Sequence, residues 1–398
     1  MNALRAGVAR MRAEGLPEPA IRGFASRFRR FAAGELGLLP DDALQPVSDV
    51  VDAARLPRAH RLERTVIVKL NGGLGTSMGL RGPKSLIEAK DGQTFLDVIA
   101  RQARALGRPL VLMNSFATRD VRPAGADAFL QHHQPRLRAD DLTPVRWPRE
   151  EALEWCPPGH GDLYAALIGS GMLDELLERG LRYAFVSNAD NLGAVPDPAI
   201  LAWFASERLE FAMEVVAGTE ADRKGGHIAL RDGRLVLRET AQAPDASSFR
   251  DFRRWRFYNT NNLWLDLEAL ARRGPPDLPL IVNRKTVDPN DPRSPAVLQL
   301  ETAMGAAIGA FERVAAVRVP RSRFVPVKTT NDLLVLRSDV YALAEDGRLE
   351  ALAPPPFVDL DPEHFGRLAD FERRFPDGPP SLAGCERFVV RGNASFAA

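Results

Sequence analysis

The stretch Val66–Ser85 constrains the fold of this 398-residue chain more than any other part of it. The run Thr65–Leu70 is rich in β-branched residues and predicts a buried strand. It opens into a loop that carries glycines at positions 72, 73, 75, 79 and 82. Such a loop lets backbone N–H groups approach an anion without obstruction from Cβ, and Lys84 adds a compact positive charge. We therefore expect a strand followed by a polyphosphate-binding loop.

Two better-known phosphate loops do not match this spacing. A P-loop needs Gly-Lys followed by Ser or Thr, but Pro83 separates Gly82 from Lys84. The glycines at 73, 75 and 79 are spaced too widely for the dinucleotide motif GxGxxG, and no strand that ends in an acid follows where a ribose would need it. A glycine-rich turn without a ligand remains the alternative.

Strands and helices alternate along the chain from about residue 60. We expect helices at 94–106 and 300–311, a helix that opens at 160–162, and strands at 109–113, 182–186, 210–216 and 257–265. This alternation predicts an α/β fold in which helices sandwich a parallel or mixed sheet. Ligands of such sheets bind at the carboxyl ends of the strands.

The two ends of the chain follow other patterns. Residues 1–58 place apolar residues such as Phe24, Phe28 and Phe31 at helical spacing and predict a helical N-terminal segment. After about Ser338 the alternation is lost and prolines cluster. We therefore divide the chain into a helical segment 1–58, a central domain 59–338 and a C-terminal segment 339–398.

Composition excludes several classes of function. A net charge of +1 provides no footprint for nucleic acid, and no apolar run is long enough to span a membrane. Cys156 and Cys385 form neither a metal-binding spacing nor a disulfide framework, so we expect a reducing, cytoplasmic environment. The Arg-rich N-terminus has no apolar core of a signal peptide; an organellar transit peptide remains the alternative to a helix of the fold.

Polar residues follow the strand expected at 182–186. Asn188 and Asp190 lie at its carboxyl end, and Asp190 is a candidate Mg²⁺ ligand because hard oxygen ligands suit Mg²⁺ and substrate phosphates complete its coordination. An Asx-turn that closes the strand is the alternative.

Three further stretches carry candidate binding residues, each with a structural alternative. His160 follows a rigid Pro-Pro-Gly turn and precedes a helix N-terminus that could face an anion, although a lone histidine is more often structural. Asn259, Asn261 and Asn262 are suited to hydrogen-bonding a polyol, but a turn explains them almost as well. Lys328 ends a basic stretch that a solvated face would also explain.

Taken together, these motifs are specific. In this order they resemble the eukaryotic-type UTP–glucose-1-phosphate uridylyltransferases, or UDP-glucose pyrophosphorylases, from about residue 20 to the end. The motifs are Leu70–Gly79, Gly82–Ser85, Met113–Phe116, Pro157–Asp162, Ser187–Gly193, Asn259–Trp264, Gln299–Ile308 and Arg323–Asp332.

The resemblance implies a fold and a set of site residues. The fold would be a Rossmann-like, glycosyltransferase-A-like nucleotidyltransferase domain with a mixed sheet, preceded by helices and followed by a C-terminal β-helix, of which the stretch Cys385–Phe396 resembles the opening coil. Catalysis would fall to Lys84 and Lys328, and Asp190 would bind Mg²⁺. UTP would be bound by Leu70, Asn71, Gly72, Gly73, Lys84, Gln131, Gly159 and Asn188, with Gln131 and Gly159 reading uracil. Glucose 1-phosphate would be bound by His160, Glu239, Asn259 and Asn261.

The implied reaction joins UTP and α-D-glucose 1-phosphate into UDP-glucose and pyrophosphate. The sugar-phosphate nucleophile is already an anion at pH 7, so the residues need only position it and neutralise charge.

We expect both lysines, Lys84 and Lys328, to be exposed. The rivals are a UDP-N-acetylhexosamine pyrophosphorylase and a non-catalytic UDP-sugar-binding protein; Ser77 and Met78 favour the glucose enzyme, since the sibling family typically has Arg-Leu there. In relatives the full β-helix is implicated in self-association, and here we expect only its opening coil, so we expect a monomer.

Overall fold

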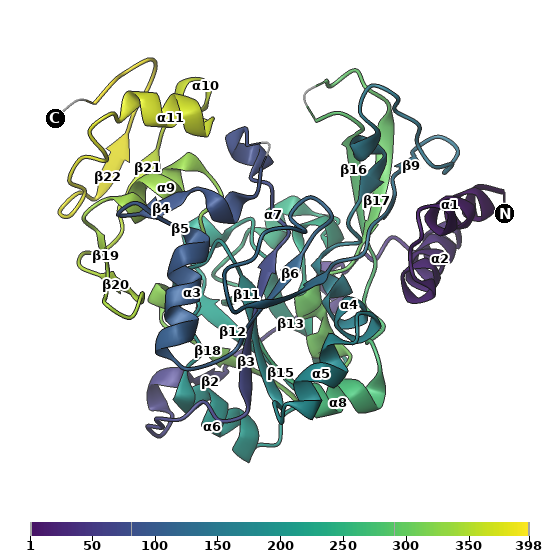
Figure 1. The fold of residues 1–398 in the computed structure, drawn as a ribbon, viewed down its shortest axis with the longest axis horizontal. Helices are drawn as coiled ribbons and strands as arrows, with labels where there is room; N and C mark the ends of the chain where they lie inside the picture. Colours follow the sequence, from purple (N-terminus) through teal and green to yellow (C-terminus); the bar gives the residue numbers. More distant parts are fainter. Residues whose placement is uncertain (1, 81, 290, 397–398) are drawn as a thin grey trace. The chain divides into compact units, whose positions relative to one another are not determined.

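The computed structural model describes residues 2–80, 82–289 and 291–396, which form two compact units (Figure 1). Neither unit is a continuous stretch of chain. Unit 1 consists of Met1–Pro57, Phe129–Ala184 and Ala202–Val319. Unit 2 consists of Arg58–Ala128, Phe185–Leu201 and Pro320–Ala398. Each unit is described by itself below, and β7 (Asp127–Leu130), β11 (Tyr183–Asn188) and α6 (Pro198–Ser206) run across a boundary.

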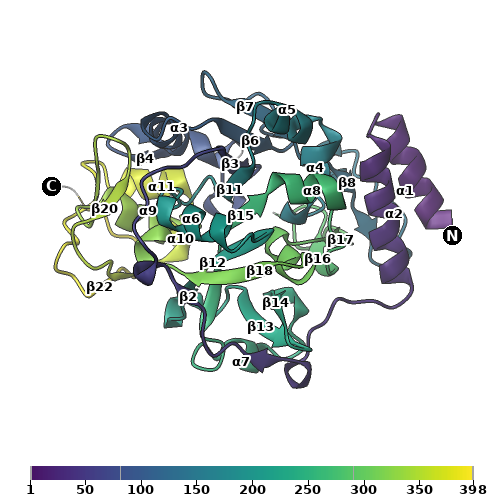
Figure 2. The same ribbon diagram turned by 90° about the horizontal axis from the view of Figure 1, so that it is seen from below.

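Unit 1 contains a mixed sheet whose central strands are long and apolar. In spatial order its strands are β2 (Val51–Asp52), β18 (Val314–Arg318), β12 (Phe211–Ala217) and β15 (Phe257–Asp266). β18 pairs in parallel with β2 and β12, whereas β12 and β15 are antiparallel. β13 (His227–Arg231) pairs with β1 (Gln45–Pro46), β14 (Arg234–Arg238) and β15 (Figure 2). β12 and β15 are buried along almost their whole length, as a strand covered on both faces requires.

A second, smaller sheet of unit 1 supports the N-terminal helices. It contains β16 (Ile281–Thr286), β17 (Ala296–Glu301) and β9 (Leu137–Arg138), all antiparallel, and β8 (Gln134–Pro135) pairs separately with β10 (Trp155–Cys156). Helices α1 (Asn2–Ala13) and α2 (Glu18–Ala32) pack their apolar faces into one core with Leu137, Leu280, Leu298 and Leu300. The other helices of the unit are α4 (Leu163–Gly169), α5 (Met172–Glu178), α7 (Ala246–Phe249) and α8 (Leu267–Arg273).

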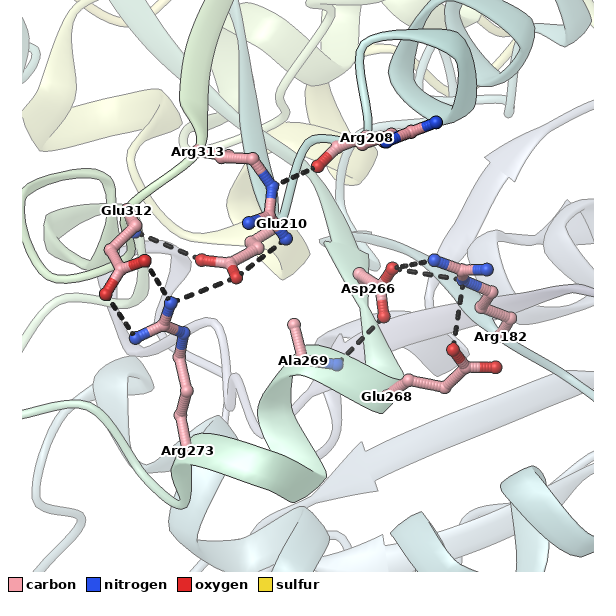
Figure 3. A network of polar contacts seen from close by, with 9 residues as sticks. All are labelled: Arg182, Arg208, Glu210, Asp266, Glu268, Ala269, Arg273, Glu312 and Arg313. Atoms are coloured by element: carbon pink, nitrogen blue, oxygen red, sulfur yellow. Dashed lines mark hydrogen bonds and ion pairs between the residues drawn. The ribbon is translucent and has the colours of Figure 1, made fainter.

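Buried carboxylates at the ends of β12 and β15, the two central strands of unit 1, form hydrogen bonds and ion pairs with neighbouring elements (Figure 3). Glu210, which precedes β12, accepts hydrogen bonds from Arg273 at 3.1 Å, Arg313 at 3.0 Å and the Glu312 N–H at 3.1 Å. Asp266, the last residue of β15, accepts two hydrogen bonds from Arg182 and caps α8 through the Ala269 N–H at 2.9 Å. Both carboxylates are therefore fully paired, as buried charge requires.

Unit 2 is built on the strand that the sequence singles out. β3 (Thr65–Asn71) is buried at nearly every position and pairs in parallel with β6 (Leu110–Asn114), while β11 lies on its other side. Thr94 caps the N-terminus of α3 (Phe95–Ala105) and forms a reciprocal capping box with Asp97. Short 3₁₀ helices at Thr76–Met78 and Lys84–Leu86 shape the glycine loop, and β4 (Glu88–Lys90) and β5 (Gln93–Thr94) form a hairpin.

The C-terminal part of unit 2 shares one hydrophobic core with α3. α9 (Thr330–Arg337), α10 (Pro362–Phe365) and α11 (Leu368–Arg374) contribute Leu334, Phe365 and Phe371, which pack in the same cluster as Phe95 and Val98. β19 (Tyr341–Leu343) and β20 (Leu349–Ala351) form a hairpin, and β21 (Phe357–Asp359) pairs in parallel with β22 (Arg387–Val389).

The predicted α/β class and mixed sheet are confirmed, and two predictions of local structure are wrong. The helix expected at 300–311 is the end of β17 followed by a 3₁₀ helix at Met304–Gly309. In the segment 1–58, α-helix ends at Ala32, and two short strands, β1 and β2, follow. Within the described residues, no helix is both long and apolar enough to cross a membrane.

Candidate functional site

The glycine loop of unit 2 is held in shape by its own backbone and by β6. Asn71, at the end of β3, donates from Nδ2 to Asn114 Oδ1 at 2.8 Å, and the Ser115 hydroxyl donates to the Gly72 carbonyl at 3.2 Å. The Lys84 N–H donates to the Gly73 carbonyl at 3.0 Å, which closes the loop. The predicted residues Asn71, Gly72, Gly73 and Lys84 therefore lie together.

Lys84 and Asp190 form the polar centre of unit 2. Lys84 Nζ lies 2.7 Å from Asp190 Oδ2 and also donates to the Val327 carbonyl. Two hydrogen bonds fix the backbone around Asp190. The Ala189 N–H donates to the Leu70 carbonyl at 3.1 Å, and the Val327 N–H donates to the Asp190 carbonyl at 3.0 Å. The Lys84 side chain is only 11% exposed, so the expectation that it is exposed is wrong; burial against its carboxylate partner is the reason.

The second oxygen of Asp190 is available for a ligand. Asp190 Oδ1 is buried and accepts no hydrogen bond from the described part of the chain. Buried carboxylate oxygens are rarely left in this state unless a water, an ion or a substrate group completes them. The described residues contain no group of three or more acidic, histidine or cysteine side chains that could hold a metal by itself. Asp190 thus fits Mg²⁺, which commonly takes one or two carboxylates together with substrate phosphates.

Lys328 stands at the entrance to α9. Its N–H donates to Asp332 Oδ2 at 2.8 Å, and its carbonyl accepts from the Ser77 hydroxyl at 2.8 Å, so the backbone is tied to the glycine loop. Its side chain is exposed and forms no hydrogen bond or ion pair with the residues the structure describes. Lys328 is therefore free to reach an anion beside the loop.

Gln131 and Gly159 lie together in unit 1. Gln131 Nε2 donates to the Gly159 carbonyl at 2.7 Å, which leaves the amide oxygen Oε1 as an acceptor. Gly159 has φ +81°, and an added Cβ would lie 2.3 Å from the Thr302 carbonyl oxygen. Only glycine fits this position, so the Gln131–Gly159 pair depends on it.

The turn that carries His160 is braced from both sides. The Met304 N–H donates to His160 Nδ1 at 2.9 Å, so in the neutral ring the proton is on Nε2, which is then a donor. The Thr302 N–H donates to Pro158 O at 3.0 Å and the Gly161 N–H donates to Thr302 O at 2.9 Å. Asp162 contacts His132 twice, through the backbone N–H at 2.8 Å and through Nδ1 at 3.0 Å.

A β-bulge brings the predicted sugar-binding amides together. β15 shifts register against β12 between Asn259 and Asn262, and Asn261 has φ +58° at this point. Asn259 Nδ2 donates to Asn261 Oδ1 at 2.9 Å, and the Asn261 N–H donates to Asn259 Oδ1 at 2.9 Å. The Asn259 N–H also donates to the Gly226 carbonyl at 2.9 Å.

Glu239 belongs to the same group. An added Cβ on Gly226 would lie 2.7 Å from Glu239 Oε2, so the carboxylate packs directly over that glycine. The sequence-based prediction includes Glu239, Asn259 and Asn261 but misses Gly226, which lies beside Glu239 at the end of the β13–β14 hairpin and accepts from the Asn259 N–H in β15. The other supporting residues that the prediction misses are Ser77, Asn114, His132, Thr302 and Met304.

The predicted residues thus gather into two groups, one in each unit. Leu70–Gly73, Lys84, Asn188, Asp190 and Lys328 belong to unit 2, and Gln131, Gly159, His160, Glu239, Asn259 and Asn261 belong to unit 1. One group offers cations, a glycine loop and a carboxylate oxygen; the other offers amides and an imidazole. Phosphate and metal chemistry suit the first, and neutral hydrogen-bonding groups suit the second.

These features define an α/β protein with a glycine-rich loop beside a lysine–aspartate pair in one unit and a group of amides and a histidine in the other. The model of the UTP–glucose-1-phosphate uridylyltransferase family matches residues 22–398, and the chain belongs to this family. A UTP–glucose-1-phosphate uridylyltransferase from Solanum tuberosum is 41% identical over 386 residues, 90% of this chain and 79% of the relative.

Solved structures agree with the family. A mutant UDP-glucose pyrophosphorylase from Leishmania major in complex with UDP-glucose is 42% identical, with a TM-score of 0.91 over 99% of this chain and 93% of that one. A UDP-glucose phosphorylase from Trypanosoma brucei is 42% identical, with a TM-score of 0.91 over 98% of this chain and 92% of that one. The predicted family and enzyme class are therefore confirmed.

Proposed function

We propose that the chain transfers the uridylyl group of UTP to α-D-glucose 1-phosphate and releases pyrophosphate, using the residues of the two groups. The observation that carries the assignment of roles is the contact between Lys84 and Asp190 beside the glycine loop, with Asp190 Oδ1 left without a partner. It combines a phosphate-binding cation, loop N–H groups and a metal-binding oxygen at one place, as nucleotidyl transfer from a triphosphate requires.

The base is read, in this proposal, by Gln131 and Gly159. Gln131 Nε2 donates to the Gly159 carbonyl, so Oε1 is the atom that can accept a hydrogen bond from N3–H of uracil. Cytosine has no hydrogen at N3 and would leave this oxygen unsatisfied. The site therefore discriminates against CTP through an unpaired buried acceptor rather than through size.

The sugar phosphate is placed by His160, Glu239, Asn259 and Asn261. A carboxylate and two amides can accept and donate several hydrogen bonds to sugar hydroxyls, and Nε2 of His160 is a donor. Since the nucleophile is an anionic phosphate oxygen, the residues need to hold it in line with the bond to pyrophosphate rather than to remove a proton.

Charge at the reacting phosphates is offset by Lys84 and Lys328. Lys84 is fixed by Asp190 and Val327, whereas the Lys328 side chain extends from the start of α9 without a partner among the described residues. Mg²⁺, when bound at Asp190 together with phosphate oxygens, would supply further neutralisation of charge. Each such contact typically contributes a few kcal/mol to lowering the barrier.

A single assay tests the proposal. Pyrophosphate release is measured with UTP, CTP and ATP against glucose 1-phosphate, N-acetylglucosamine 1-phosphate and galactose 1-phosphate. We expect the highest kcat/KM with UTP and glucose 1-phosphate, and loss of activity in excess EDTA. Preference for N-acetylglucosamine 1-phosphate would instead assign the sibling activity, and equal rates with UTP and CTP would contradict the role of Gln131.

Finer features of the resemblance stay predictions. These are the glycosyltransferase-A-like and β-helix descriptions of the fold, the three-segment division, the cytoplasmic location and the monomeric state. Light scattering at micromolar concentration tests the last of them, since a stable dimer or octamer would contradict it.

A further inference from the structure

Unit 1 contains a cavity of about 430 Å³ that none of the predicted substrate residues lines. It lies between α2 and α4, which pack beside each other (Figure 2), and its lining is completed by Gly161, Asp162, the segment 275–278 and Thr302. Cavities that bind small molecules in proteins typically have volumes of roughly 300–1,000 Å³. The cavity is therefore large enough for a ligand of about the size of a monosaccharide phosphate.

The α2 wall of the cavity is cationic. Arg22, Arg27 and Arg30 line it from one helix. Arg30 is already paired with Glu35 and with Asp277 at 3.0 Å. Arg27 has no ion pair within the described residues, and Arg22 is exposed and has neither an ion pair nor a hydrogen bond there. Arg22 and Arg27 thus have no carboxylate at ion-pair distance within the described residues, and Arg22 is open to an anion from solvent.

Arg27 is the least satisfied of them. Its Nη2 donates to Gln134 at 2.8 Å, but its Nε is buried without an acceptor in the described part of the chain. Burial lowers the pKa of Arg27, and the Asp162 carboxylate, which also lines the cavity and accepts from His132, partly offsets this without forming an ion pair with Arg27. A buried guanidinium N–H without an acceptor is costly, so Arg27 is the group of this wall that gains most from a nearby anionic charge.

The opposite wall is apolar. Tyr164, Ile168 and Leu278 line it, and the Tyr164 hydroxyl donates to the Met304 carbonyl at 2.7 Å, so this hydroxyl is not available to a ligand. A cationic wall and an apolar wall together select a molecule with an anionic head and a small cyclic or apolar body.

We propose that this cavity binds an organic phosphate and that its occupancy changes the affinity for UTP. Gly161 and Thr302 form part of the lining, and their backbone hydrogen bonds hold the turn Pro158–His160. A ligand that favours one arrangement of this turn must change, by linkage, the affinity of whatever Gly159 and His160 bind. The second part of this proposal rests on the proposed function; the first does not.

Phenyl phosphate is the probe, because it joins a dianion to an apolar ring. Its binding is measured by calorimetry with UDP-glucose present in excess to occupy the substrate site, alongside phenol and inorganic phosphate. We expect phenyl phosphate to bind more tightly than either, and at least about tenfold more weakly to Arg27→Gln, since a hydrogen bond to a charged group is lost. Arg22→Gln should weaken binding too, and because Arg22 is exposed this variant does not endanger the fold.

Arg29→Gln is the matched control, because Arg29 is an exposed arginine of the same helix that does not line the cavity. The site is overturned if phenyl phosphate binds the Arg27→Gln and Arg22→Gln variants as tightly as the parent, or binds no better than phenol.

The coupling is tested separately by the KM for UTP with and without phenyl phosphate. We expect a change of at least about twofold in the parent and none in Arg27→Gln. An unchanged KM with confirmed binding overturns the coupling alone. If the chain does not use UTP, the proposed function fails, and calorimetry without UDP-glucose still decides whether the cavity binds phosphate.

Discussion

At the residue scale, the two lysines that we assign to phosphate differ in what they do for the fold. Lys84 is largely buried and paired with Asp190, whereas Lys328 is exposed and has no partner among the described residues. Replacing an exposed side chain rarely changes stability by more than about 0.5 kcal/mol, but removing one partner of a buried pair leaves the other uncompensated. Replacing Lys84 should therefore lower the stability of the fold, whereas replacing Lys328 should not.

We expect Lys328→Ala to lower kcat by about two orders of magnitude or more with an almost unchanged free energy of unfolding. Lys84→Ala should lower kcat similarly and also destabilise the fold by roughly 1–3 kcal/mol, because Asp190 loses its partner. Steady-state kinetics and urea unfolding of both variants are the measurements. Wild-type kcat/KM in either variant would show that this lysine does not act on the reacting phosphates.

Lys90 provides the control for this comparison. It is buried in the same unit, and its Nζ donates to the carbonyls of Arg337 at 3.1 Å and Ser338 at 2.8 Å, away from the predicted site residues. Lys90→Met should therefore destabilise the protein and leave the KM values unchanged. A large change in kcat for this variant would show that stability, not phosphate contact, explains the loss in Lys84→Ala.

His227 makes stability depend on pH. It is fully buried, stacks on Trp255 at 4.6 Å, and neither ring nitrogen has a hydrogen-bond partner within the described residues. Burial, reinforced by the Arg238 charge, lowers its pKa to about 3. In the unfolded chain the histidine has a pKa of about 6.5, so it binds a proton there first as the pH falls.

The stabilisation is complete above pH 6.5 and is lost as the pH falls from 6.5 towards 3. At pH 5 the cost is on the order of 2 kcal/mol relative to pH 8. His227→Phe should show a correspondingly smaller loss of unfolding free energy between pH 8 and pH 5, measured by urea unfolding at both values. Parallel pH profiles for the variant and the parent would contradict this account.

At the element scale, the central strands β12 and β15 depend on carboxylates at their ends as well as on apolar burial. Glu210 lies at the start of β12 with a side chain only 2% exposed, and Arg273, Arg313 and the Glu312 N–H satisfy it. None of the predicted site residues belongs to this network (Figure 3). A change here should therefore act on stability rather than on chemistry.

We expect Glu210→Ala to destabilise the protein by about 1–2 kcal/mol, because Arg273, Arg313 and the Glu312 N–H lose the acceptor that they share, while both arginines stay partly solvated. The KM for UTP should stay within about twofold of the parent. Glu312→Ala is the matched control: its carboxylate also contacts Arg273, at 2.7 Å, but is 66% exposed, so the loss should be much smaller. Equal losses in the two variants would contradict the importance of burial in this network.

Local sequence patterns correctly predict elements that are buried along their whole length. They fail where pairing with a distant strand determines whether a segment is helix or strand. β3 is predicted almost to the residue, because β-branched residues fill it. The segment 300–311 contains Leu-Glu and Ala-Met-Gly-Ala-Ala, which favour helix. Leu300 nonetheless pairs with Val282 in β16, so strand geometry wins up to Glu301. By contrast, the contact of Gly226 with Glu239 follows from the β13–β14 hairpin, which pairs His227 with Arg238 and turns at Asp232-Gly233, a local signal that the prediction did not use.

At the scale of the whole molecule, sequence order and spatial order differ. The sequence suggests three consecutive segments, but each compact unit is assembled from three separated stretches of chain. The site residues could be named from the sequence because their motifs are local and specific. Their division into two groups could not, since it depends on which stretches fold together.

The interleaved chain has a consequence for how the protein is made on the ribosome. α3 is synthesised early, yet the core that it shares with Leu334, Phe365 and Phe371 is supplied by the last part of the chain. Unit 1 likewise gains β18, which pairs with β12 and β2, only after residue 313 has been added. Neither unit can complete its core while most of the chain is still emerging, so apolar surfaces of early elements stay uncovered for most of translation. A nascent chain of this kind relies on chaperones, or on fast synthesis, to a greater degree than one whose domains follow each other in order.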